Sequence, residues 1–320
     1  MVERNTVSVC IPTCNRPALL CQAIQSCLVQ TRKPDCIIVG DDSTNDASEQ
    51  MIADLVKETD IQIDYRRNPI PLGQNENTNS VFDRATSSHL ILLHDDDVLL
   101  PNAVGDLLSC WHEHPTLTAA YGKQYVMSHD GAIDLKGSIG LNAAYSRIPE
   151  RSGLQINDWE VGLLQQFPND GYMILTSAAQ STHWRPQKDA GDGGDFDFGL
   201  RLGFTCRGFF FLDRFTMKYR MTETGTVSDS KNSDTALSSY LILERFNFSL
   251  SGEALRAGEA IRAKRMAEIA PLAMAQSIRR GQRKQAFRIY CSRHHSWRKR
   301  FSIGGVRRLS MLLLSLVNPR

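Results

Sequence analysis

The sequence predicts an α/β fold, with a mostly parallel sheet flanked by helices and a helical extension at the C-terminus. Strand-like apolar segments alternate with helical segments over residues 6–112, the pattern of strands joined by helical crossovers. Charge also divides the chain. Residues 252–320 hold 16 basic and 3 acidic residues, a net charge of +13, whereas residues 1–251 hold 21 and 32, a net charge of −11. We therefore expect an acidic α/β domain over 1–230 and a basic helical extension over 231–320.

Four strands and four helices are expected in the first part of the chain. The strands are short runs rich in β-branched and apolar residues, bounded by polar turns. They cover 6–11, 36–40, 61–65 and 89–93, and the helices cover 18–29, 47–57, 75–85 and 101–112. Sheets of this kind bind ligands beyond the carboxyl ends of their strands, so the pattern is typical of a nucleotide-binding unit.

The pattern is mixed after the fourth strand. A glycine-rich turn at 191–194 leads into an amphipathic helix, and the pattern becomes helical from Asp234 onward. The other expected elements are a strand over 118–127, a helix over 154–166, and strands over 208–212 and 216–221.

Composition and cysteine usage narrow the class of protein. Hydrophobic residues make up 42% of the chain and charged residues 22%, values of a globular rather than a disordered protein. None of the eight cysteines forms a Cys-x-x-Cys pair, which argues against a zinc ribbon or a thioredoxin-like site. The first residues lack the apolar core of a signal peptide, and no apolar run reaches the ~18 residues of a membrane span. We expect reduced thiols and a cytoplasmic protein.

Three consecutive carboxylates, Asp95, Asp96 and Asp97, follow the expected strand 89–93. A divalent cation relieves the repulsion between such groups, and hard oxygen ligands suit Mg²⁺ or Mn²⁺. Such an ion is commonly shared with a substrate diphosphate. The alternative is a solvated acidic turn with Asp97 near the start of the next helix.

Two further acidic pairs also allow two interpretations. Asp41 and Asp42 follow the strand 36–40, where a carboxylate can bind a base or ribose or form an Asx turn. Asp195 and Asp197 lie in the glycine-flanked turn. Either carboxylate can accept the proton of a hydroxyl group as a general base, or cap the following helix.

Taken together, these segments resemble the family 2 glycosyltransferases, which have the GT-A fold. Five matches keep the family's order over residues 6–228. They are Val7–Arg16 (VSVCIPTCNR), Val39–Asp46 (VGDDSTND), His94–Pro101 (HDDDVLLP), Gly194–Leu202 (GDFDFGLRL) and Tyr219–Thr222 (YRMT).

The resemblance implies a role for each matched residue. Asp195 matches the catalytic base, and Asp96 and Asp97 match the carboxylates that bind Mg²⁺ or Mn²⁺. Arg201 matches a helix arginine that braces the site. The residues implied in binding the nucleotide-sugar are Pro12, Thr13, Asn15, Arg16, Asp41, Asp42, Asp95 and Arg220.

The sequence departs from the family pattern at three positions. His94 occupies the place of the family's first Asp, so Asp95 is expected to face the ribose. Gly194 replaces a Glu before the base, and Thr222 replaces a His that can contact the metal or the diphosphate. The resemblance therefore implies fewer protein ligands for the metal.

The activity implied is the inverting transfer of a sugar from a nucleoside-diphosphate donor to a glycan or lipid-linked acceptor. UDP is the nucleotide expected from the family, and the pathway expected is cell-surface polysaccharide biosynthesis. A non-catalytic nucleotide-sugar or glycan-binding subunit is one alternative. A sugar nucleotidyltransferase is another, although residues 12–16 lack the glycines of its phosphate loop.

The basic extension allows two interpretations as well. Residues 298–320 are basic and then apolar, a composition that binds anionic membrane surfaces. This favours a peripheral protein on the inner face of the membrane. Otherwise, the extension is a helical domain that packs on the acidic body, with Leu312–Val317 in a core or an oligomer contact. No nucleic-acid-binding motif is present, so nucleic acid is not an expected partner.

Overall fold

The computed structural model describes residues 5–221 and 233–317. These residues form two compact units. The first contains the described residues up to Gln187 and those from Phe198 to Met221, and the second contains Lys188–Asp197 and the described residues from Ser233 onward. The expected boundary between residues 230 and 231, and Thr222, lie outside the described residues, as do 318–320.

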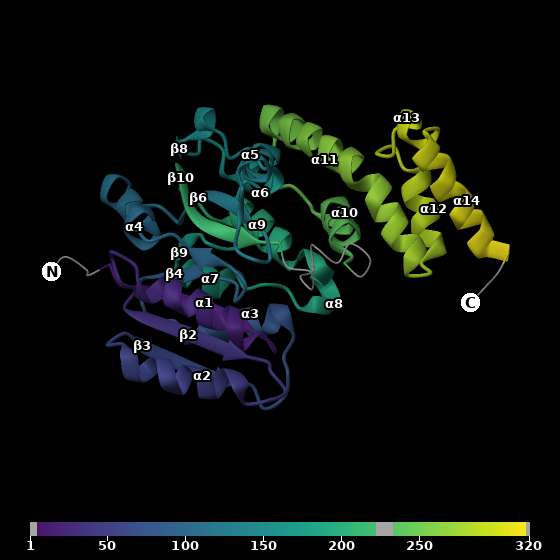
Figure 1. Cartoon of the computed structure of the whole chain (residues 1–320). Coiled ribbons are helices and arrows are strands. Elements are labelled where there is room, and N and C mark those ends of the chain that lie inside the picture. The colour runs from purple at the N-terminus through teal and green to yellow at the C-terminus, as the bar shows by residue number, and fades with distance from the viewer. Residues whose placement is uncertain (1–4, 222–232, 318–320) are drawn as a thin grey trace. The chain divides into compact units, whose positions relative to one another are not determined.

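A mixed sheet is the centre of the first unit (Figure 1), and its strand order is β3-β2-β1-β4-β9-β6-β10-β5. Its strands are β1 Val7–Thr13, β2 Cys36–Asp41, β3 Gln62–Arg67, β4 His89–Leu92, β5 Val98–Leu99, β6 Ala119–Met127, β7 Ile133–Asp134, β8 Gly153–Leu154, β9 Met173–Leu175 and β10 Phe209–Arg220. The first four strands pair with one another in parallel, which confirms the predicted parallel sheet in this part.

Helices connect and cover these strands. They are α1 Pro17–Leu28, α2 Ala47–Leu55, α3 Gln74–Arg84, α4 Ala103–Glu113, α5 Leu135–Ala144, α6 Asp158–Leu163, α7 Thr176–Thr182, α8 Gln187–Ala190 and α9 Gly194–Thr205. The four helices expected between residues 18 and 112 are present, although α4 begins at Ala103 because the short strand β5 pairs with β10 just before it.

The middle of the chain differs from the prediction in two places. The helix expected over 154–166 is present but shorter: α6 covers Asp158–Leu163, whereas Leu154 lies in β8, which pairs with β10. The two strands expected over 208–212 and 216–221 form the single strand β10. Its pairing with β6 shifts register around Phe215, and such a bulge allows one strand to continue through a local bend.

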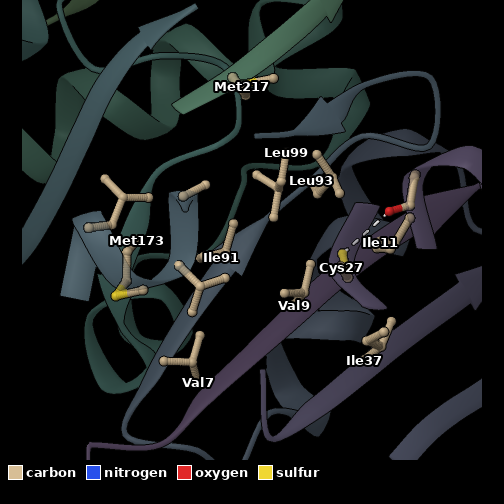
Figure 2. Packing of buried hydrophobic residues seen from close by; sticks show 14 of the residues in the cluster. Val7, Val9, Ile11, Cys27, Ile37, Ile91, Leu93, Leu99, Met173 and Met217 are labelled. Carbon is tan, nitrogen blue, oxygen red and sulfur yellow. Dashed lines mark hydrogen bonds between the residues drawn. The ribbon is translucent and has the colours of Figure 1, made fainter. Parts of the chain in front are cut away.

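Alternation along β1 supplies both hydrophobic cores of the first unit. Val7, Val9 and Ile11 pack into one cluster with residues of α1, and Cys10 packs into a second cluster on the opposite face. Figure 2 shows the first cluster, in which Ile91 of β4 lies near these side chains. Successive side chains point to opposite faces of a strand. A central strand covered on both faces is therefore apolar throughout, as the sequence of β1 is.

The second unit is helical after its first segment (Figure 1), as predicted from Asp234 onward. Its helices are α10 Thr235–Arg245, α11 Gly252–Arg279, α12 Arg283–Cys291, α13 Trp297–Arg300 and α14 Ile303–Val317. The backbone N–H of Leu237 donates to Gln276 Oε1 over 2.7 Å, which ties α10 to α11. Among the described residues, we find no helix with the length and apolarity required to span a bilayer.

Candidate active site

The ends of strands β1, β2 and β4 meet at one edge of the sheet, as the sequence predicts. The hydroxyl of Thr13, the last residue of β1, donates to Asp95 Oδ2 over 2.6 Å. The backbone N–H of Asp42 donates to Thr13 O over 3.0 Å, and that of Asn15 donates to Ser43 Oγ over 2.7 Å. Parallel strands bring their carboxyl ends to the same edge, so segments 82 residues apart are in direct contact.

Arg16 binds two carboxylates of the acidic cluster. Its Nη2 lies 2.5 Å from Asp95 Oδ1, its Nε donates to Asp95 Oδ2 over 3.1 Å, and its Nη1 donates to Asp96 Oδ2 over 2.8 Å. Asn15 turns the chain just before Arg16 and α1, because its φ is +55°. Asparagine tolerates this conformation better than most residues. One guanidinium therefore offsets part of the charge of three adjacent carboxylates.

Burial makes the acidic cluster costly to charge. Asp95 is fully buried, and desolvation raises its pKa to about 6 although the Arg16 charge opposes the shift. Desolvation also raises the pKa of Asp97 well above its usual value, and the negative charge of Asp170 adds to the shift. Carboxylates in such surroundings are stabilised by a cation. The site is therefore suited to a positive ligand.

Asp41, the last residue of β2, and Asp42 stabilise the backbone around them. Asp41 accepts hydrogen bonds from the backbone N–H of Ser43 over 2.7 Å and from the Tyr65 hydroxyl over 2.9 Å. Burial and this hydrogen bond raise the pKa of the Tyr65 hydroxyl. Asp42 accepts from the backbone N–H groups of Leu72 and Gly73. Both carboxylates shape the rim of the site, and their contact with a nucleotide stays a prediction, as it does for Pro12.

Arg220 lies behind the acidic cluster at the end of β10. Its backbone N–H donates to Asp97 Oδ1 over 2.6 Å, and its guanidinium donates to Asp96 O, His129 O and Gln22 Oε1. These bonds fix the backbone of the acidic turn, and Arg220 itself is only 5% exposed. Its predicted contact with a diphosphate is untested.

Asp170 is a member of the site that the sequence analysis missed. It is fully buried, and its Oδ2 accepts a hydrogen bond from the backbone N–H of His94 over 2.9 Å. Strand β9 pairs antiparallel with β4, so its beginning lies beside the end of β4. The turn before β9 contains Gly171, whose φ of +70° favours glycine. A polar turn before an apolar strand was the available signal, but a parallel sheet would have placed it at the opposite edge.

The residues present fit a divalent cation. His94, Asp96 and Asp97 each offer one ligand atom, and these atoms lie within 4.8 Å of one another. The Oδ2 of Asp97 is buried, and within residues 5–221 and 233–317 it has no hydrogen-bond partner. A buried carboxylate oxygen without a donor is costly, and a metal ion would satisfy it. Asp96 and Asp97 are the carboxylates predicted to bind metal.

The expected base, Asp195, belongs to the second unit. It is in the first turn of α9 and is partly exposed, whereas Asp197 is buried. The same unit fixes the preceding turn, because the backbone N–H of Asp234 donates to Asp192 Oδ2 over 2.7 Å. The role of Asp195 toward the acidic cluster stays a prediction. In the first unit, Arg201 donates to the carbonyls at the end of α7, the bracing position expected of it.

Comparison with protein families and curated sequences supports one assignment. Residues 8–161 match the model of Glycosyl transferase family 2. A GalNAc(5)-diNAcBac-PP-undecaprenol beta-1,3-glucosyltransferase of Campylobacter jejuni is 38% identical over 103 residues, 32% of this chain and 33% of that protein. An uncharacterized Mycobacterium tuberculosis protein is 32% identical over 124 residues, 39% of this chain and 38% of that protein. The match thus spans well under half the length of either curated relative.

Solved structures extend the likeness to nearly the whole chain. S. aureus TarS 1-349 in complex with UDP-GlcNAc has a TM-score of 0.61 at 13% identity, and the match covers 97% of this chain and 81% of that one. The mannosyltransferase PcManGT from Pyrobaculum calidifontis, in complex with GDP-Man and Mn²⁺, has a TM-score of 0.59 at 12% identity, covering 99% and 88%. At these identities the likeness shows the fold. Residues 8–161, just under half of the chain, thus match glycosyltransferase family 2, and the chain has the GT-A fold.

Proposed function

We propose that this protein transfers a sugar, with inversion, from a nucleoside-diphosphate donor to a hydroxyl of a glycan or lipid-linked acceptor. The observation that carries the proposal is the acidic cluster Asp95–Asp97, held by Thr13 and Arg16 where the parallel strands end. UDP is the first candidate nucleotide, since TarS was solved with UDP-GlcNAc, although PcManGT was solved with GDP-Man. The Campylobacter relative is named for a PP-undecaprenol-linked acceptor. A role in cell-surface polysaccharide biosynthesis would follow.

The proposed reaction is a single displacement. Asp195 accepts the proton of the acceptor hydroxyl, and an electron pair of that oxygen forms the new bond to the anomeric carbon. The bond between this carbon and the diphosphate oxygen breaks, and its electrons leave with the nucleoside diphosphate. Because attack and departure take place on opposite faces, the configuration inverts and no covalent sugar–enzyme intermediate forms.

The acidic cluster and Arg16 support the departure of the diphosphate. Asp96 and Asp97 would hold Mg²⁺ or Mn²⁺, which when bound supplies Lewis-acid stabilisation of the leaving diphosphate. Arg16 has a guanidinium that is one-third exposed at this edge. It is suited to charge-assisted hydrogen bonds with phosphate oxygens. Thr13 donates to Asp95, the residue that we expect to bind the ribose.

A donor screen tests this function on the full chain. Melting temperatures are measured with UDP, GDP and dTDP and their sugars, with and without Mn²⁺. A donor that binds the folded state raises the melting temperature as it saturates the site. We expect one nucleotide-sugar to do so in a metal-dependent way, and to release a nucleoside diphosphate when an acceptor is added. Release of pyrophosphate would indicate a nucleotidyltransferase instead, and binding without turnover would indicate a non-catalytic subunit.

We also propose that the segment 297–308 attaches the protein peripherally to an anionic membrane surface. Trp297 and Phe301 are both 69% exposed and Ile303 is 92% exposed, and the two aromatic rings lie 6.4 Å apart. The basic residues of this segment are Arg298, Lys299, Arg300, Arg307 and Arg308. Exposed aromatic residues among basic ones bind the interface of anionic bilayers. This would place the enzyme beside a lipid-linked acceptor on the inner face of the membrane.

Vesicle flotation tests the membrane proposal. The full chain is expected to float with vesicles containing phosphatidylglycerol and to dissociate as salt is raised, because screening weakens the basic contacts. Replacing Trp297 and Phe301 together by Ser should lower vesicle binding roughly tenfold or more, since burying each ring in the bilayer contributes about 1.5–3 kcal/mol. Phe287→Ser is the matched control, because Phe287 of α12 is also exposed, at 58%. Equal flotation of all variants would contradict the proposal.

A further inference from the structure

The acidic cluster includes an imidazole at the position where the family pattern has a carboxylate. His94 lies at the end of β4, and one of its ring nitrogens lies within 4.8 Å of ligand atoms of Asp96 and Asp97. The side chain is 18% exposed. Its Nε2 is buried and, within the described parts of the chain, has no hydrogen-bond partner. An imidazole nitrogen of this kind is free to bind a metal.

The other ring nitrogen, Nδ1, faces polar neighbours. It lies 3.9 Å from Asp170 Oδ2 and 3.5 Å from Asn169 Nδ2. The same Asp170 oxygen accepts the backbone N–H of His94 over 2.9 Å. One buried carboxylate therefore fixes the backbone of His94 and lies near Nδ1, whose hydrogen-bond neighbour is the side-chain amide of Asn169.

Asp170 has the surroundings of a positioning residue. It is fully buried, its Oδ2 is committed to His94, and it interacts electrostatically with Asp97. Histidine ligands of metals commonly donate their second ring N–H to a carboxylate, which orients the ring and raises its basicity. Here the Asp170 carboxylate lies 3.9 Å from His94 Nδ1, beyond hydrogen-bond distance, and it positions His94 through the hydrogen bond to the backbone N–H. His94 comes from the end of β4, and Asp170 comes from the turn before the antiparallel strand β9.

We propose that His94 Nε2 is a ligand of the divalent cation and that Asp170 is its positioning residue. The inference rests on the proposed function, since it concerns the metal that supports the diphosphate. It adds a protein ligand to a metal site that the resemblance implies has fewer of them. Mg²⁺ takes oxygen ligands and seldom nitrogen, so a site with one imidazole should prefer Mn²⁺ over Mg²⁺.

Pulsed electron paramagnetic resonance of the full chain with Mn²⁺ and UDP tests the ligand. The parent protein should show ¹⁴N modulation from a directly bound imidazole. His94→Asp should bind Mn²⁺ without that modulation, and its preference for Mn²⁺ over Mg²⁺ should fall roughly tenfold. His112→Asn, which changes an exposed histidine of α4, should leave both unchanged. Bound Mn²⁺ without ¹⁴N modulation in the parent overturns this inference and leaves the proposed function standing. If no Mn²⁺ binds with UDP, both the inference and the metal role fail.

A double-mutant comparison tests the role of Asp170. Asp170→Asn should lower Mn²⁺ affinity by about 10–100-fold in the parent and much less in the His94→Asp background, because the two residues act through one ligand. Equal losses in both backgrounds would show that Asp170 does not act through His94. If Asp170→Asn unfolds, Asp170→Glu keeps the carboxylate and is measured in the same two backgrounds. Thermal unfolding of each variant shows which comparison applies.

Discussion

Replacing Asp195 by Asn is expected to lower kcat of sugar transfer by about 10²–10⁴-fold, the usual contribution of a general base. The amide is similar in size to the carboxylate but cannot accept the proton of the acceptor hydroxyl. Asp195 is partly exposed in the first turn of α9, so the substitution should leave the fold intact. Nucleotide affinity, measured by titration calorimetry with UDP, should stay within about twofold, because the base acts on the acceptor rather than on the donor.

Asp189→Asn provides the matched control for this prediction. Asp189 is exposed, lies in α8 and belongs to the same unit as Asp195. It has no assigned role, so its variant should transfer sugar at the parent rate. A parent rate for Asp195→Asn would remove Asp195 as the base. A loss of UDP binding in that variant would indicate a structural or donor-binding role instead.

Replacing Asp96 by Asn is expected to cost about 10³-fold in kcat/KM, equivalent to roughly 4 kcal/mol of transition-state stabilisation. The variant loses one charged metal ligand, and Mn²⁺ affinity in the presence of UDP should fall with it. The side chain of Asp96 is 14% exposed, and Arg16 keeps its ion pair with Asp95. The site should therefore remain folded. Steady-state kinetics over a Mn²⁺ titration measure the effect.

Metal removal separates this loss from a structural one. Chelation with EDTA should inactivate the parent to a rate near that of Asp96→Asn, and should change the variant little further. Added Mn²⁺ should restore the parent fully. Asp60→Asn, at an exposed loop position of the same unit, should behave as the parent throughout. An Asp96→Asn variant with parent kcat/KM and parent EDTA sensitivity would exclude Asp96 as a metal ligand.

Local patterns predicted the first half of the fold well. The four strands β1 to β4 and the helices between them follow from short apolar runs, helical spacing and polar turns, which depend on neighbours in the chain. The helix expected over 154–166 is shorter in the structure, because Leu154 pairs as a strand with Phe210 of β10 and the helix covers only Asp158–Leu163. Tertiary context overrides local propensity in such short segments.

The candidate site was also predictable from the sequence only in part. Thr13 and Asp95 were identifiable because each follows an apolar strand, and parallel strands share one ligand-binding edge. The sequence could not show that Arg16 pairs with Asp95 and Asp96, since that contact joins residues about 80 positions apart. It also could not show that Arg220 holds the acidic turn through its backbone N–H and guanidinium.

The sequence by itself determined the α/β alternation, the acidic strand ends and the division of charge between an acidic body and a basic helical extension. All three are properties of neighbouring residues. The direction of β9 was decided only by the tertiary structure, and it brings Asp170 beside His94, 76 positions away. Periodicity of two shows that a segment is a strand, but it is the same for a parallel and an antiparallel neighbour. Long-range packing sets the direction, and so decides which polar turns reach the site.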